Sequence, residues 1–131
     1  MKKIFYCASF LFGFALLSTV AHAAADEFFK SKAIRLVVGN SVGGAQDDWA
    51  RFVAQYLGKH IPGNPDIVVQ NMPGAGGIIA ANHIYNVAKP DGLTVGMVNP
   101  ANYIDQLLGS KEVKFDWPKF SWIGSPERID Q

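Results

Sequence analysis

The chain contains little cysteine and no excess of charge of either sign. Cys7 is the one cysteine among its 131 residues, so no disulfide can close within the chain. Lysines and arginines together number 12, against 11 aspartates and glutamates. Proteins that bind nucleic acids or anionic membrane surfaces through electrostatic attraction carry a strong positive charge, which this composition lacks. We therefore expect no nucleic-acid partner.

The sequence also lacks the motifs of several enzyme classes and of metal sites. No Gly-Lys-Ser or Gly-Lys-Thr forms a phosphate-binding P-loop, no histidine or cysteine spacing fits a metal ion, and no serine stands in a nucleophile elbow. Gly74-Ala75-Gly76 begins like a dinucleotide-binding fingerprint, but the third glycine would fall at Ile79. We therefore expect binding without catalysis, metal or cofactor.

The N-terminus has the features of an export signal. Two lysines precede an apolar run over residues 4–20, and an Ala-His-Ala triplet after the run fits the small-residue cleavage pattern. A transmembrane anchor is the alternative, but the run lies at the extreme N-terminus and is barely long enough to span a bilayer. We expect cleavage after Ala23, so that residues 1–23 are a signal peptide and residues 24–131 are the exported, periplasmic chain.

A glycine-rich stretch over residues 70–81 organises the chain. It follows an apolar segment typical of a strand and precedes apolar residues at helical spacing, so it is a strand-to-helix loop. Gly74, Gly76 and Gly77 allow positive φ and the close approach of another molecule, and Pro73 fixes the entry to the loop. Free amides and the positive end of the next helix dipole then form a site for an anion such as a carboxylate or phosphate. The alternative is a glycine-rich turn without a ligand.

The rest of the chain alternates between strand and helix patterns. Apolar segments predict strands over residues 33–38, 66–69 and 93–98, and helical spacing predicts helices over residues 48–57, 78–88 and 101–108. One apolar face of the first helix is formed by Trp49, Phe52, Val53, Tyr56 and Leu57. Gly109 is expected to close the third helix, and a polar stretch follows it over residues 110–119. The alternation predicts an α/β fold, with a parallel sheet, right-handed crossovers and helices on both faces.

Ligands of such sheets bind at the carboxyl ends of the strands. Three loops reach that edge, namely residues 39–47, the stretch 70–81 and residues 99–100. The first two are both glycine-rich and both precede a helix, which favours a ligand site. Asp47 either caps the first helix by accepting from its first-turn amides or contacts the bound molecule. Asn99 either caps the third helix or lines the site.

Several short motifs resemble a known family when they are taken as an ordered set. They are Ile34-Arg35-Leu36-Val37-Val38, Gly43-Gly44-x-x-Asp47 with Ala50-Arg51, residues 59–65, residues 69–77, Pro90-Asp91-Gly92 and Trp122-Ile123-Gly124-Ser125-Pro126. This set resembles the periplasmic substrate-binding receptors of tripartite tricarboxylate transporters, the Bug or TctC-like family. The resemblance runs from Phe29 to the end of the chain. Ala45 departs from it, because a third glycine is common at that position.

The resemblance implies a type II periplasmic-binding-protein fold, whose two lobes close on small organic carboxylates and deliver them to permease subunits in the membrane. It also implies that the ligand carboxylate is held by backbone amides and bridging waters of the first two loops, here residues 41–47 and 73–77. With Asn99 added, the candidate ligand-binding residues are Ser41, Gly43, Gly44, Asp47, Pro73, Gly74, Ala75, Gly76, Gly77 and Asn99.

Members of this family are considerably longer than this chain. We therefore expect residues 24–131 to form the N-terminal part of the first, substrate-binding lobe, with the second lobe absent. The resulting hypothesis is a periplasmic solute receptor, or a truncated fragment of one. Two alternatives stay open: an exported α/β enzyme fragment that lacks its catalytic half, and a non-functional remnant.

Overall fold

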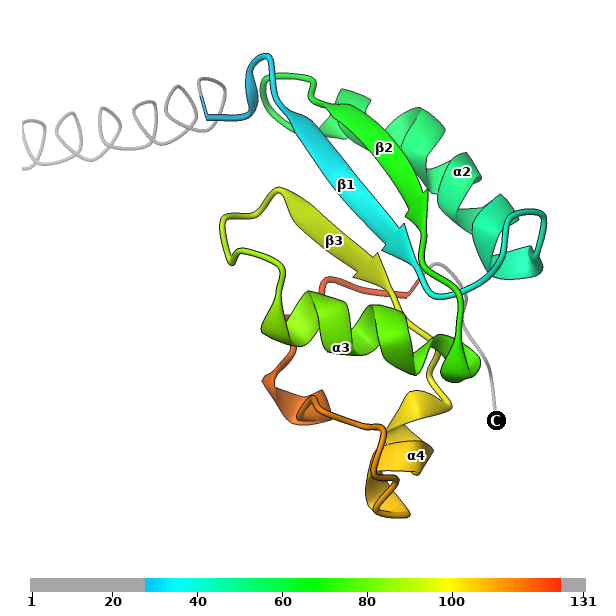
Figure 1. Cartoon of the computed structure of the whole chain (residues 1–131). Coiled ribbons are helices and arrows are strands. Elements are labelled where there is room, and N and C mark those ends of the chain that lie inside the picture. Colours follow the sequence, from blue (N-terminus) through cyan, green and yellow to red (C-terminus); the bar gives the residue numbers. More distant parts are fainter. Residues whose placement is uncertain (1–27, 126–131) are drawn as a thin grey trace, which may run out of the picture.

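The computed structural model describes residues 28–125, so the predicted signal peptide and its cleavage site lie outside the described residues. Strands and helices alternate along this part of the chain (Figure 1). The elements are β1 (Ala33–Val38), α2 (Ala45–Leu57), β2 (Asp66–Asn71), α3 (Ile78–Asn86), β3 (Thr94–Met97) and α4 (Asn102–Leu107). Short 3-10 segments lie at Gly58–His60, Ala75–Gly77 and Trp117–Lys119. The predicted α/β class is confirmed.

The strands form a parallel sheet in the order β2-β1-β3. The central strand β1 pairs with β2 from Ala33 opposite Asp66 to Val38 opposite Asn71. β2 therefore runs two residues beyond its predicted end at Val69, because the pairing with β1 continues that far. Asn71, which we assigned to the loop, belongs to the sheet.

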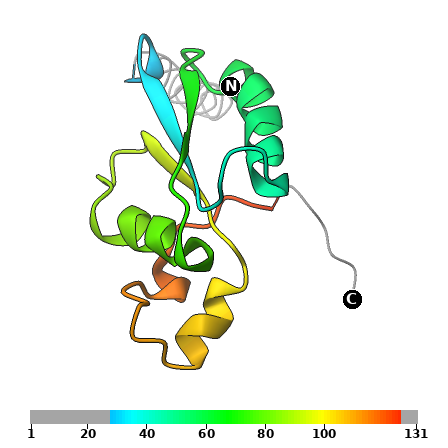
Figure 2. The same ribbon diagram turned by 45° about the vertical axis from the view of Figure 1, so that its right-hand side comes forward.

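Helices cover both faces of the sheet, as predicted. Figure 2 shows α2 on one side of the strands and α3 on the other. The chain steps from β1 to β2 in one direction and then returns past β1 to β3, so right-handed crossovers place the two helices on opposite faces. The core under α2 contains Leu36, Val38 and Ala50. The core of α3 contains Ile78, Ala81 and Phe115.

Helix α2 begins at Ala45, three residues before the predicted start, with Gly44 at the N-cap position. Asp47 and Ala50 are its buried residues. The small side chain of Ala50 packs against β1 and so allows a close approach of helix and sheet. The prediction that the aromatic side chains of this helix lie on its buried, apolar face was therefore wrong. These lie 43, 56 and 44% exposed, at Trp49, Phe52 and Tyr56.

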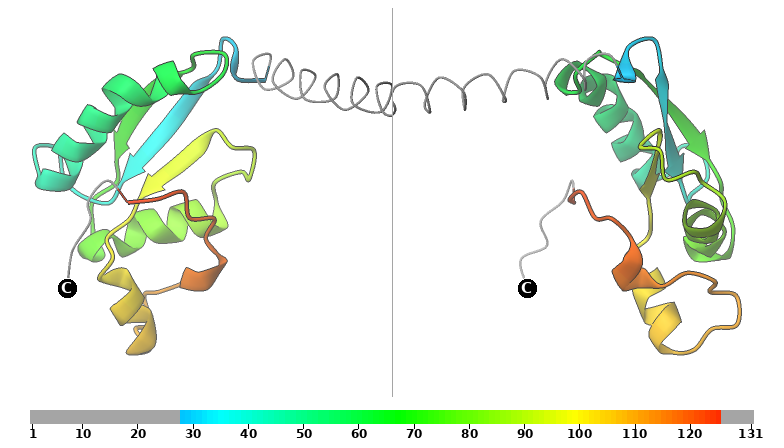
Figure 3. Two further views of the ribbon diagram at one scale, coloured as in Figure 1. Left: turned by 180° about the vertical axis from the view of Figure 1, so that it is seen from behind. Right: turned by 90° about the vertical axis from the view of Figure 1, so that its left-hand side faces the viewer.

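Gly109 ends α4, as predicted. Its φ is 70°, and the amides of Gly109 and Ser110 donate to the carbonyls of Gln106 and Asp105 at 3.0 and 3.1 Å, which is the left-handed glycine cap of a helix. The stretch after it, which we predicted to be polar, carries Phe115 into the core of α3. Figure 3 shows this segment running back from α4 past α3.

No helix within residues 28–125 is both long enough and apolar enough to cross a membrane. The parallel sheet with two covered faces is consistent with part of one lobe of a periplasmic-binding-protein fold.

Candidate functional site

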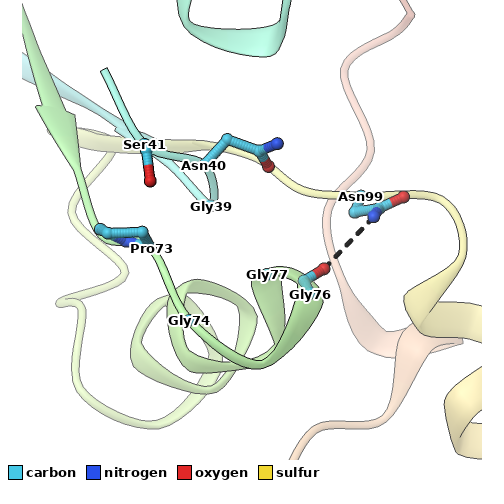
Figure 4. A pocket seen from close by; sticks show the side chains of 8 residues that line it. All are labelled: Gly39, Asn40, Ser41, Pro73, Gly74, Gly76, Gly77 and Asn99. Carbon is cyan, nitrogen blue, oxygen red and sulfur yellow. Dashed lines mark hydrogen bonds between the residues drawn. The ribbon is translucent and has the colours of Figure 1, made fainter. Parts of the chain in front are cut away.

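The loops that follow the three strands meet at the carboxyl edge of the sheet and line an open pocket of about 220 Å³ (Figure 4). The strand order reverses direction beside β1, and open α/β sheets bind ligands at such a switch point. In Figure 4 the hydroxyl of Ser41 points toward the loop after β2. The pocket is lined by Gly39, Asn40, Ser41, Pro73, Gly74, Gly76, Gly77 and Asn99. None of these side chains is charged.

The loop after β2 is a left-handed turn. Ala75, Gly76 and Gly77 have φ angles of 47, 61 and 98°. The amide of Gly77 donates to the carbonyl of Gly74 at 3.0 Å, and the amide of Ile78 donates to the carbonyl of Ala75. The glycines adopt this backbone without strain, whereas Ala75 places a Cβ in the left-handed region. The positive φ predicted for this loop is confirmed.

This turn leaves two backbone amides unbonded beside the pocket. Within the described residues, the amides of Ala75 and Gly76 donate no hydrogen bond. A trans peptide holds its N–H opposite its C=O. Because the carbonyl of Ala75 faces the amide of Ile78, the N–H of Gly76 points away from α3. The amides also precede the N-terminus of α3, whose dipole adds positive potential, so the turn suits an anionic group.

A buried polar cluster holds the loop after β1. Asp47 is 1% exposed. Its Oδ2 accepts from the amide of Gly43 at 2.8 Å and from Nε of Arg51 at 2.9 Å, and its Oδ1 accepts from Nδ2 of Asn71 at 2.9 Å. Asn71 Nδ2 also donates to the carbonyl of Asn40 at 3.0 Å. The hydrogen bond from Arg51, followed by those from Gly43 and Asn71, lowers the pKa of Asp47 to about 2.

The N-cap role that we weighed for Asp47 is wrong. The residue lies inside the first turn of α2. The backbone amide that donates to its carboxylate is that of Gly43, which precedes the helix. Asp47 does not line the pocket either, and among the other candidates Gly43, Gly44 and Ala75 do not line it. The candidates that do are Ser41, Pro73, Gly74, Gly76, Gly77 and Asn99. Ligand binding by any of these residues stays a prediction.

Two asparagines after β3 contact the left-handed turn. The Nδ2 atoms of Asn99 and Asn102 each donate to the carbonyl of Gly76 at 3.2 Å. The first of these bonds is drawn in Figure 4. The Oδ1 of Asn99 accepts from the amide of Ala101 at 3.0 Å, just before α4. Asn99 therefore lines the pocket and also bonds the backbone that leads into the helix.

Three residues of this region were not among the predicted ligand-binding residues, although two of them lie in a loop that we expected at this edge. Asn40 and Gly39 line the pocket, and a Cβ on Gly39 would lie 3.0 Å from Cα of Gly77, so glycine allows the first two loops to touch. The glycine after a buried strand was a signal for this approach. Asn102 is 1% exposed although it is polar. Its sequence position at a helix start gave no sign of burial.

Within residues 28–125, no group of three or more histidine, cysteine, aspartate or glutamate side chains is placed to hold a metal ion. The pocket is thus an uncharged site, lined largely by backbone, at the switch point of a parallel α/β sheet.

Comparison with known proteins gives two related sequences, while no protein-family model matches the chain. The chain is 41% identical over 83 residues to the UPF0065 protein in the gbd 5' region of Cupriavidus necator, which covers 63% of this chain and 24% of that protein. It is 33% identical over 104 residues to a UPF0065 protein of Bordetella bronchiseptica, which covers 79% of this chain and 30% of that protein. The chain thus spans less than a third of the length of either relative. These similarities support a relationship to the UPF0065 proteins.

Proposed function

We propose that this chain forms one wall of a binding site for small organic carboxylates in an exported solute receptor, and that it binds without catalysis. The pair of unbonded amides at Ala75 and Gly76, beside an uncharged pocket, carries this proposal. Amides at the start of a helix favour a negatively charged group. The hydroxyl of Ser41 lies on the opposite wall and supplies a further donor.

The transport role rests on the resemblance to Bug and TctC-like receptors. UPF0065 is a name of that same family, so the two relatives give it coarse support. Periplasmic location after removal of the signal peptide and delivery of the ligand to membrane permease subunits belong to this proposal.

Nuclear magnetic resonance of the full chain tests the carboxylate site. We expect citrate or succinate to shift the amide resonances of Ala75 and Gly76, and we expect the neutral analogue succinamide to leave them unchanged. The pocket is open, so it buries little of a small ligand, and we expect millimolar affinity, or about −4 kcal/mol. An equal response to succinamide, or shifts that spare both amides, would remove the carboxylate from this site.

A further inference from the structure

Asn102 contacts the loop after β2, which lines the pocket, but does not line the pocket itself. It is the first residue of α4 and is 1% exposed. Its Nδ2 donates to the carbonyl of Gly76 at 3.2 Å and to Oδ2 of Asp105 at 3.1 Å. Asp105 lies three residues along the same helix, so its carboxylate holds the Asn102 amide group in one orientation, in which the remaining N–H reaches Gly76.

The carbonyl that Asn102 holds belongs to a peptide that is bonded at both ends. The peptide between Gly76 and Gly77 is planar, so its C=O and N–H move together. Its oxygen accepts from Asn102 and Asn99, and its N–H donates to the carbonyl of Gly74 at 3.0 Å. The orientation of this plane sets the backbone angles of Gly76, and these in turn set the direction of the unbonded Gly76 amide.

The side-chain oxygen of Asn102 does not help to hold this peptide. Within the described residues, its Oδ1 is buried without a hydrogen-bond partner. A buried acceptor without a partner is unfavourable. The stabilising contribution of this side chain therefore comes through Nδ2, and thus through the Gly76 carbonyl and Asp105.

We infer that Asn102 is a positioning residue, which holds the Gly76–Gly77 peptide in the left-handed turn and thereby directs the neighbouring amides toward the proposed carboxylate site. The geometric part of this inference stands on the contacts above, and its relevance to binding rests on the proposed function. Asn99 bonds the same oxygen, but it lines the pocket itself. A substitution at Asn99 would therefore mix positioning with direct contact, whereas Asn102 separates them.

Amide hydrogen exchange of the full chain tests the inference. We expect Asn102→Leu and Asn102→Asp at pH 7 to lower the protection of the Gly77 amide about fivefold, the size expected for the loss of one hydrogen bond. The affinity for citrate should fall with it. The matched control is Asn82→Leu, which removes another helix-to-loop asparagine, bonded to the backbone of Lys114 and Glu112. That control should leave Gly77 protection and citrate affinity unchanged.

Acidification separates positioning from a general loss of packing. In Asn102→Asp the introduced carboxyl faces the carboxylate of Asp105 and the carbonyl of Gly76. Once protonated it regains an O–H donor, and the neighbouring carboxylate raises the pH at which this occurs. We expect Gly77 protection to recover in Asn102→Asp as the pH falls to about 4, and not to recover in Asn102→Leu.

Two results would overturn the inference. One is unchanged Gly77 protection in folded Asn102→Leu. The other is unchanged citrate affinity in a variant whose Gly77 protection has fallen. A wild-type chain that binds no carboxylate would instead defeat the proposed function, and the exchange data would still decide whether Asn102 holds the peptide.

Discussion

The side chains of Asp47 and Arg51 lie one turn apart on α2, where Nε of Arg51 donates to Oδ2 of Asp47 at 2.9 Å. The two partners differ in burial, because the Asp47 side chain is 1% exposed and that of Arg51 is 50% exposed. The guanidinium also donates to Oδ1 of Asn71 at 3.2 Å. A half-exposed cation thus neutralises a buried carboxylate and ties it to the end of β2.

This pair makes stability depend on pH in the acid range. The pKa of Asp47 is lowered from 3.8 to about 2 in the folded chain. The unfolded chain therefore takes up the proton first as the pH falls, so the contribution of Asp47 is complete above about pH 4 and is lost as the pH falls toward 2. We expect Asp47→Asn to lower Tm at pH 7, and its difference from wild type to shrink between pH 4 and pH 2.

Thermal unfolding followed by circular dichroism measures this difference. Asp48→Asn, at the exposed neighbouring position in the same turn, is the control and should change Tm little at either pH. A difference between Asp47→Asn and wild type that stays constant down to pH 2 would show that the charge of Asp47 is not what stabilises the fold.

Gly76→Val should weaken carboxylate binding. The φ of Gly76 is 61°, and a Cβ there would meet no atom within 4 Å, so the added side chain strains the backbone and occupies open space beside the amides. A side chain in the left-handed region costs about 1–2 kcal/mol. We expect about a tenfold loss of affinity, equivalent to 1.4 kcal/mol. Calorimetry with citrate measures it.

The control for that variant is Gly92→Val. Gly92 has a φ of 77° and equally open surroundings, but it lies in the turn before β3, away from the pocket. Both variants should lose similar stability, and Gly92→Val alone should keep full affinity. Full affinity in folded Gly76→Val would take this loop out of the binding site.

Ala75→Gly should stabilise the chain slightly. Ala75 has a φ of 47°, which costs an L-residue about 1–2 kcal/mol. Glycine removes this strain but adds about 0.4–1 kcal/mol of unfolded-state entropy. We expect a net gain between zero and about 1.5 kcal/mol in urea unfolding. Ala54→Gly, inside α2, is the contrast and should lose about 1 kcal/mol or more.

The orientation of α2 predicts which of its contacts stabilise the fold. Leu36 is 3% exposed in the core under α2, whereas Phe52 is 56% exposed on the outer face of the helix. We expect Leu36→Ala to lose about 2–5 kcal/mol, and Phe52→Ala to lose less than about 1 kcal/mol. Denaturant unfolding compares them. A large loss in Phe52→Ala would place the aromatic side chains in the core after all.

Export of the chain is a separate prediction. We expect cleavage after Ala23, so that the exported product begins at Ala24. N-terminal sequencing of the periplasmic fraction measures this directly. Protein that keeps Met1 and stays with the membrane would support the anchor alternative instead.

Most of the sheet could be predicted from the sequence, because strands covered on both faces leave short apolar runs such as Leu36-Val37-Val38 of β1. The glycine-rich loop before α3 was equally readable, since its glycines are needed for positive φ. The buried face of α2 was not. The apolar pattern ranks Trp49 above Ala50, but a helix lying close against a sheet needs a small residue at the contact.

The polar contacts of the site join residues that lie far apart in the sequence, so no local sequence pattern predicts them. Asn71 contacts Asp47 and Asn40, and Asn102 contacts Gly76, between segments that the pairing of β1 with β2 and β3 brings together. A sequence shows that each of these residues is polar. It does not show that the amide of Asn102 is buried, because burial follows from the packing of α4 beside the loop.

The central position of β1 also makes the pocket depend on two separate strand pairings. Both partners of β1 come later in the chain, and the pocket takes residues that follow β1, β2 and β3. Pairing of distant segments is slow, because the intervening chain must close as a loop before the contacts stabilise it. The Asp47 cluster takes its residues from the segments that follow β1 and from the end of β2, so it depends on the pairing of β1 with β2. Asn99 and Asn102, whose side chains hold the Gly76 carbonyl, follow β3, so the complete pocket also requires the pairing of β1 with β3.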